Sequence, residues 1–369
     1  MIEVTKSTVF NGNCPPKASK SHAFFTTENQ IKDLYHDMFG IRIEADEDFF
    51  EFDDDAMDHG IAFVGRINEY FDRSFDLSVL AEAKTPSALS QLIEGLKPCN
   101  WDIVHVGRSP NDTPPVFCFA ASAESVLGYK TLQGEFDGVR SACIFLPPGS
   151  AGRRNTLDLQ TQITHYVEIV QDLQIRGPYY LIGEGRGGIF AYEVANQLVS
   201  QGKQVALLAL IDTPGPDAIE GVPSWRSMLR NRIQILNTRV AQRLYRSRLK
   251  RRKADRINRP SIGRKHFFRT RMKSAEEDVL RQKVLRTDLL VRQLTMGHIP
   301  APYYGQIILF RSSKLNPNLR SDRSLGWRSV FPHGGLVVRE IPSYYGSMLK
   351  QPFVGFLASE LRSVTGTTR

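Results

Sequence analysis

The chain has 369 residues, of which 41% are hydrophobic and 24% are charged, and its 48 Lys and Arg against 39 Asp and Glu give a net charge of +9. This composition is typical of a globular protein and excludes a disordered, collagen-like or coiled-coil chain. At roughly 100–200 residues per domain, the length predicts two or three domains.

Targeting signals are not evident in the sequence. Residues 1–25 form a polar leader without a long apolar core, and no later stretch reaches the roughly 18 uninterrupted apolar residues of a membrane span. We therefore expect a cytoplasmic protein without a transmembrane segment. Metal-ligand spacing is absent among the four cysteines, Cys14, Cys99, Cys118 and Cys143, so we expect reduced thiols and no metal site.

The charge is unevenly distributed along the chain. Residues 1–100 carry a net charge of −9, whereas residues 217–300 carry +15. These values predict an acidic first domain and a basic segment inserted later in the chain. No internal repeat of 20–50 residues is present, which excludes a solenoid.

Three apolar stripes at steps of three and four predict helices in residues 26–98. The stripes consist of Ile31, Leu34 and Met38, then Met57, Ile61, Val64, Ile67 and Phe71, and then Leu89, Leu92 and Leu96. Thr26 or Thr27 is suited to cap the first helix, which should end near Gly40, and Pro86 is suited to the start of the last. We expect a small helical bundle.

Residues 48–57 read DFFEFDDDAM, which resembles the DDFFELGGDSL signature of acyl and peptidyl carrier domains. In that family the serine opens the second helix and carries a phosphopantetheine arm. The serine position here is Ala56, which has no oxygen to phosphorylate, and Asp53 and Asp54 replace the two glycines. The resemblance implies a carrier-type fold without its cofactor. The alternative is a generic acidic bundle in which Ala56 is simply a good helix former.

Beyond residue 114 the pattern changes to short apolar runs that alternate with amphipathic segments. The runs are 116–119, 142–146, 179–182, 205–211, 307–310 and 336–338, and the amphipathic segments include 160–173 and 189–198. Alternation of this kind predicts an α/β fold with a mostly parallel sheet that is covered on both faces.

Residues 183–188 read GEGRGG and join a predicted strand directly to a predicted helix. This is the context of the nucleophile elbow, G-x-S-x-G, in which glycines permit a sharp turn and the central serine attacks the substrate. The central position here is Gly185. A dinucleotide-binding loop is a weak match, because the glycines do not follow the opening strand of a βαβ unit.

The longer run RGPYYLIGEGRGGIFAYEVANQL, residues 176–198, resembles the type I thioesterase domains that terminate nonribosomal peptide and polyketide synthetases. The similarity covers nearly all of residues 114–364. It implies an α/β-hydrolase fold with a helical lid over an acyl pocket. It also implies that Asp212 is the retained acidic triad member, that Gly185 replaces the serine, and that Tyr345 replaces the histidine.

The resemblances imply two domains. The leader at 1–25 precedes a carrier-like domain at 26–98, a linker at 99–113 and a thioesterase-like domain at 114–366, whose basic lid spans about 217–300. The expected fold class is thus a small α bundle followed by an α/β-hydrolase domain.

Hydrolysis of an acyl ester by this fold needs a nucleophile, an imidazole base and a carboxylate that orients the imidazole. Glycine at 185 offers no attacking atom, and a tyrosine, with a reference pKa of about 10, is a poor base at neutral pH. We therefore predict a pseudoenzyme, a non-catalytic binding or regulatory protein in secondary-metabolite or acyl metabolism.

Two alternatives remain open. The first is an acyl-thioester hydrolase or acyltransferase with relocated catalytic residues, for which Glu184, Ser122, Ser125 and His333 are candidates. Ordinary roles also suit these residues, because Glu184 can pair with Arg186, Ser122 can cap a helix and His333 precedes a predicted turn. The second alternative is a synthetase remnant without a selected function.

The basic lid contains a predicted amphipathic helix. Its apolar residues are Trp225, Leu229, Ile233, Leu236, Val240 and Leu244, and its basic residues include Arg226, Arg230, Arg239 and Arg243. A basic run that includes Arg251 and Arg252 follows this helix. It suits an acidic protein or carrier domain, an anionic membrane or simply solvent, whereas nucleic acid is disfavoured because no binding motif accompanies the charge. We expect the Asp53–Asp55 edge to dock on this lid in a salt-dependent manner, and the pocket beneath it to accept an acyl ligand.

Overall fold

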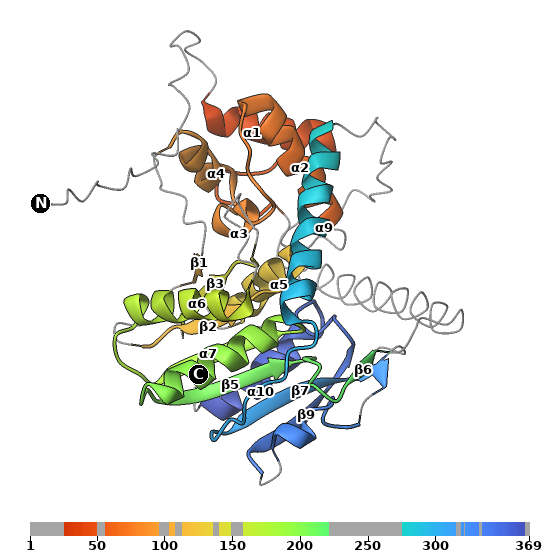
Figure 1. The fold of residues 1–369 in the computed structure, drawn as a ribbon. Coiled ribbons are helices and arrows are strands. Elements are labelled where there is room, and N and C mark those ends of the chain that lie inside the picture. The colour runs from red at the N-terminus through yellow and green to blue at the C-terminus, as the bar shows by residue number, and fades with distance from the viewer. Residues whose placement is uncertain are drawn as a thin grey trace, which may run out of the picture.

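The computed structural model describes residues 26–49, 56–95, 103–107, 113–135, 140–148, 158–220, 275–314, 319–320, 322–331 and 334–365. The polar leader, Asp53–Asp55, His333 and lid residues 221–274 lie outside the described residues, as do Cys14 and Cys99. Within those ranges the chain forms a group of four helices, here called the helical unit, and an α/β unit (Figure 1).

The helical unit consists of α1 (Thr27–Phe39), α2 (Ala56–Phe71), α3 (Val79–Glu82) and α4 (Pro86–Ile93). Thr26 caps α1, and its side chain accepts a hydrogen bond from the backbone N–H of Asn29. Gly40 ends α1 in the left-handed conformation, and Thr85 caps α4, which begins with Pro86. The predicted helix starts and stops at these positions are therefore confirmed.

The α/β unit is built on a seven-stranded sheet with the order β1-β3-β2-β4-β5-β7-β9. Its strands are β1 (Ile103–Val106), β2 (Val116–Phe119), β3 (Ala142–Phe145), β4 (Tyr179–Glu184), β5 (Val205–Ile211), β7 (Ile307–Lys314) and β9 (Leu336–Tyr344). Every neighbouring pair is parallel except β1 and β3. A separate two-stranded sheet joins β6 (Ile219–Glu220) to β8 (Leu319–Arg320).

One boundary predicted from the sequence needs correction. Residues 103–106 lie inside the predicted linker, yet they form β1 and pair antiparallel with β3 at the edge of the sheet. A four-residue edge strand gives only a short apolar pattern in the sequence, here Ile103 and Val104, and both of these residues are buried. The segment is therefore part of the sheet.

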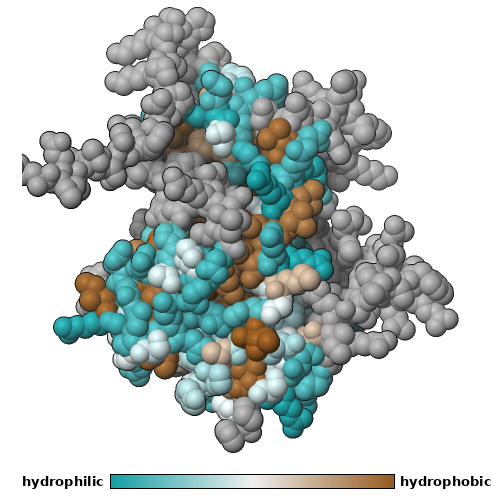
Figure 2. Space-filling model, in the orientation of Figure 1, coloured by the Kyte–Doolittle hydropathy of each residue, from teal (hydrophilic) through white to brown (hydrophobic). Residues whose placement is uncertain are grey.

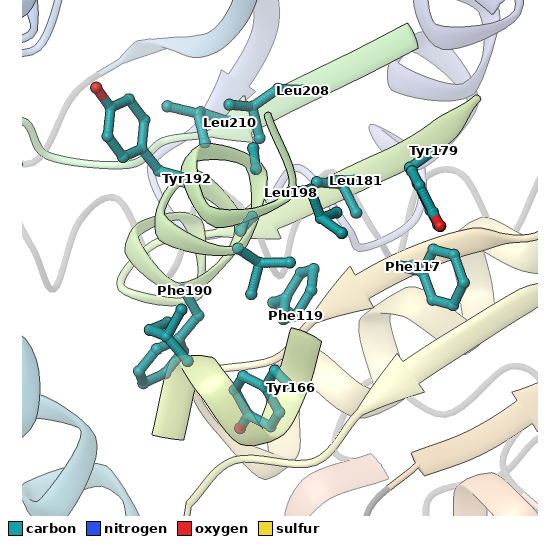
Figure 3. Packing of buried hydrophobic residues seen from close by; sticks show 14 of the residues in the cluster. Phe117, Phe119, Tyr166, Tyr179, Leu181, Phe190, Tyr192, Leu198, Leu208 and Leu210 are labelled. Atoms are coloured by element: carbon teal, nitrogen blue, oxygen red, sulfur yellow. The ribbon is translucent and has the colours of Figure 1, made fainter. Parts of the chain in front are cut away.

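Helices cover both faces of this sheet. The α6 (Leu159–Leu173) and α7 (Gly187–Ser200) helices pack on one face, and α5 (Ala123–Gly134) and α10 (Val354–Thr365) pack on the other. Figure 3 shows Phe119, Tyr166 and Phe190 close together, with ring centroids 5.6 Å apart for the first two and 5.8 Å apart for the last two. Burial on both faces explains why the central strands are continuously apolar.

A long helix, α9 (Ala275–Thr295), runs from the helical unit to the α/β unit and is drawn in cyan (Figure 1). Among the described residues, no helix is both long and apolar enough to cross a membrane.

Candidate functional site

The turn between β4 and α7 forms the centre of the candidate site. Gly185 lies in this turn with a φ of 54°, in the left-handed region, and its N–H donates to the carbonyl oxygen of Ile211 at 2.8 Å. A Cβ placed on Gly185 has no heavy atom within 4 Å. The position at which a nucleophile elbow holds its serine is therefore open to a side chain.

The neighbouring glycines of the turn are in a different environment. A Cβ on Gly183 would lie 2.4 Å from Gly188 Cα, and one on Gly187 would lie 2.2 Å from the carbonyl oxygen of Phe119. A Cβ on Gly188 would lie 2.0 Å from Thr213 Oγ1. These three glycines allow the close approach of strand and helix on which the elbow depends.

Asp212 follows β5 and is 1% exposed, with a φ of 45°. Its carboxylate accepts hydrogen bonds from the N–H and hydroxyl of Ser312, at 2.7 and 2.5 Å, and from the N–H of Gly346 at 3.3 Å. Burial raises the pKa of Asp212 to about 6, and these hydrogen bonds act against that shift. The carboxylate is thus fixed between β7 and the turn after β9.

Tyr345 lies in that same turn and is half-buried. Its backbone N–H donates to the carbonyl oxygen of Lys314 at 2.9 Å, and the next residue, Gly346, contacts Asp212. Because Gly185, Asp212 and Tyr345 each follow the carboxyl end of a parallel strand, β4, β5 and β9 respectively, all three meet at one edge of the sheet. This is the edge where open α/β sheets bind ligands.

A second polar group lies beside the elbow. Glu184, at the end of β4, accepts a hydrogen bond from the hydroxyl of Ser125 at 2.6 Å, and the hydroxyls of Ser125 and Ser122 are 3.1 Å apart. Ser122 also caps α5, as the sequence suggested. Arg186, the suggested partner of Glu184, donates to Thr295 Oγ1 at 3.2 Å.

The surroundings of Glu184 raise the pKa of its carboxyl group. Burial raises its pKa to about 7, the hydrogen bond from Ser125 acts in the opposite direction, and the carboxylates of Glu124 and Asp212 add to the rise. A carboxyl group with a pKa near neutrality can act as a general acid or base. The sequence analysis named Glu184 and Ser125 separately. Because 59 positions separate them, the sequence did not show that their side chains form a hydrogen bond.

The remaining predicted site residue, Ala56, is the first residue of α2. It belongs to the helical unit, whereas Gly185, Asp212 and Tyr345 belong to the α/β unit. Clusters of three or more His, Cys, Asp or Glu side chains that could hold a metal ion are absent from the described part of the chain.

Comparisons with known proteins agree with this geometry. Residues 114–255 match the thioesterase domain family. The chain is 30% identical over 118 residues to a non-reducing polyketide synthase of Pseudevernia furfuracea, covering 32% of this chain and 6% of that protein. It is 26% identical over 189 residues to a dimodular nonribosomal peptide synthase of Bacillus subtilis (strain 168), covering 50% of this chain and 8% of that protein.

A third relative, named an inactive atromentin synthetase, of Paxillus involutus, is 25% identical over 223 residues, which are 57% of this chain and 23% of that protein. The chain thus spans a small part of each relative's length. A solved structure of a four-domain nonribosomal peptide synthetase, bound to AMP and glycine, is similar in fold with a TM-score of 0.54 and 20% identity over 95% of this chain and 27% of that one. Residues 114–255 of the chain are therefore similar to thioesterase domains, and parts of the chain are similar to nonribosomal peptide and polyketide synthases.

Proposed function

We propose that this chain is a thioesterase-like pseudoenzyme, a non-catalytic binding or regulatory protein in secondary-metabolite or acyl metabolism. The observation that carries the proposal is Gly185, a residue without a side chain at the centre of an otherwise well-formed elbow. Asp212 keeps a buried place at the same edge of the sheet, but a carboxylate alone cannot perform acyl transfer.

The chemistry sets the expected scale of any remaining activity. Loss of a triad member in a serine hydrolase leaves about 10³–10⁴-fold catalysis over water, from binding and the oxyanion hole. Tyr345 stands where the family has its base, so the proton-accepting group is replaced as well. One relative, 25% identical over 57% of this chain, is itself named an inactive synthetase, which supports the proposal by analogy.

We further propose that the helical unit is a carrier-type domain that has lost its attachment point. Its order of helices and the place of Ala56 at the start of α2 support this assignment. The fold similarity to the four-domain synthetase supports it too, because 95% coverage of this chain extends into the helical unit.

Hydrolysis is tested with the purified full chain and a panel of acyl thioesters of different length. We expect at most the trace of turnover that binding and an oxyanion hole can supply, because no nucleophile faces the substrate at Gly185. The matched measurement uses the Asp212→Asn variant, which should behave like the unaltered protein. Turnover well above background that disappears in Asp212→Asn would contradict the pseudoenzyme proposal.

Attachment of the cofactor is tested by coexpression with a phosphopantetheinyl transferase and intact-mass analysis. We expect no added mass on the unaltered protein, since a methyl group at position 56 cannot form the phosphodiester. The Ala56→Ser variant is the matched comparison and restores the missing hydroxyl. An arm-sized mass increase on the unaltered protein that maps to residues 48–60 would overturn the assignment.

The contact between Ser125 and Glu184 favours a second candidate function, acyl-thioester hydrolysis with relocated residues. In this scheme Glu184 takes the proton of the Ser125 hydroxyl, the oxygen adds to the thioester carbonyl, and the carbon–sulfur bond breaks as the thiolate receives that proton. Water then hydrolyses the serine ester. Ser125 is only 6% exposed, which weighs against the scheme.

The second candidate predicts that Ser125→Ala and Glu184→Gln each abolish turnover, while Glu168→Gln, on an exposed face of α6, retains it. Turnover that survives Ser125→Ala would exclude this scheme.

A further inference from the structure

The helix α9 contributes to two separate hydrophobic cores. Leu280, near its start, is 2% exposed and packs with the buried residues of α1, α2 and α4. Val291, three turns later, is 1% exposed and packs in the core between the sheet, α6 and α7. More than 180 residues separate Leu280 from the end of α4 in the sequence. The core of the helical unit therefore includes a side chain from a distant part of the chain.

Close packing of α2 against α9 supports this description. A Cβ on Gly65 of α2 would lie 3.2 Å from the backbone nitrogen of Glu277, so the two helices approach closely at that point. One turn further along α9, Arg281 forms an ion pair with Asp58 of α2 at 3.0 Å. Figure 1 shows the first half of α9 lying beside α2.

The second half of α9 is fixed to the α/β unit. Thr295, its last residue, accepts a hydrogen bond from Arg186 of the elbow. Just after the helix, His298 Nε2 lies 2.8 Å from Glu193 Oε1 of α7, and the carbonyl oxygen of Ala301 accepts from the Tyr192 hydroxyl. Because this end is anchored, the helical unit cannot move away without withdrawing Leu280 from its core.

A second contact lies between the helical unit and α5. Lys130 of α5 forms an ion pair with Asp48 at 2.9 Å, and the two side chains are only 16% and 15% exposed. Leu127 of α5 packs against the core of the helical unit, and Ala81 of α3 is buried in the core beneath α5. The surface of α5 and α9 that contacts the helical unit, here called the α5–α9 face, is thus apolar at its centre and has a mostly buried ion pair at its edge.

We infer that the first half of α9 is part of the helical unit. The helical unit therefore stays packed against the α5–α9 face and does not detach as a mobile domain. This differs from the electrostatic docking expected from the charge map, in which Asp53–Asp55 contact the lid arginines. The inference holds whether or not the helical unit is a carrier-type domain, because it rests on packing alone. Salt screens interactions between exposed charges but does not weaken buried apolar contacts, so the helical unit should stay packed on the α5–α9 face at high salt.

The test compares two leucines of the same helix. Leu280 is buried in the core of the helical unit, whereas Leu285 is 61% exposed, on a stretch of α9 where Figure 2 shows hydrophobic surface. Hydrogen exchange of the full chain should become about tenfold faster, or more, throughout α2 and α4 in Leu280→Ala, because a cavity opens between the units. In Leu285→Ala the exchange of both helices should be unchanged.

Small-angle scattering provides an independent readout. The radius of gyration of the unaltered protein should be the same at about 0.05 M and 1 M salt, since the centre of the α5–α9 face is apolar. If Leu280→Ala does not fold, Leu280→Val against Leu285→Val makes the same comparison with a smaller cavity. Equal exchange in each matched pair, or a radius of gyration that grows with salt, would overturn the inference.

Discussion

The Glu184→Gln variant should be more stable to unfolding than the unaltered protein at pH 8, and nearly equal to it at pH 4.5. Glu184 is half-buried beside the elbow, where burial raises its pKa from 4.5 to about 7. Keeping an ionised carboxylate in that place costs free energy, and an amide of the same shape avoids the cost while still accepting the Ser125 hydrogen bond.

The direction follows from proton linkage. The folded protein holds the Glu184 proton up to a higher pH than the unfolded chain does, so the contribution to stability is fully present below the unfolded pKa of 4.5 and is lost as the pH rises through about 7. At about 1.4 kcal/mol per pKa unit, the rise from 4.5 to about 7 corresponds to roughly 3–3.5 kcal/mol at pH 8. Asp212, whose pKa burial raises to about 6, contributes in the same direction.

Urea unfolding at a series of pH values between 4.5 and 8 measures this effect. The control is Glu168→Gln, which removes a carboxylate from an exposed position of α6 and should leave the pH profile unchanged. A Glu184→Gln profile parallel to that of the unaltered protein would mean that Glu184 is ionised without cost, with enough water around it to do so.

Local features of the fold could be predicted from the sequence because they depend on few residues. The cap at Thr26, the helix end at Gly40 and the helix start at Pro86 are short-range signals, and the structure confirms them. The central strands are buried on both faces, so their continuous apolar runs identified them. The elbow was recognisable because its glycines join a strand directly to a helix.

Long-range contacts could not be predicted in the same way. Leu280 looks like any apolar position of an amphipathic helix, and nothing near it in sequence shows which core it enters. The Ser125–Glu184 bond likewise depends on how β2 and β4 pair, which brings the residues after both strands together. The predicted docking of Asp53–Asp55 on the lid arginines involves residues outside the described ranges, whereas the described contact of α2 with α9 includes the Arg281–Asp58 ion pair and apolar packing.

Replacing glycine by alanine at two positions of the elbow should give very different results. At Gly187 the new methyl group would lie 2.2 Å from the carbonyl oxygen of Phe119, a backbone atom of a central strand that cannot move easily. Alanine normally favours a helix over glycine by about 1 kcal/mol, but the clash is larger, and we expect a loss of about 3 kcal/mol or more. At Gly185 the methyl group meets open space, and only the positive φ opposes it, at a cost of about 1–2 kcal/mol.

Urea unfolding followed by circular dichroism measures both alanine variants, and Gly185→Ser should behave like Gly185→Ala. This outcome would mean that packing does not require glycine at position 185, since the turn accepts a side chain at the place that we propose corresponds to the nucleophile of thioesterases. The absence of a side chain would then reflect the chemistry of this protein and not the demands of its fold. A Gly185→Ala variant as unstable as Gly187→Ala would instead make Gly185 a structural glycine, and the comparison with a nucleophile elbow would lose its main support.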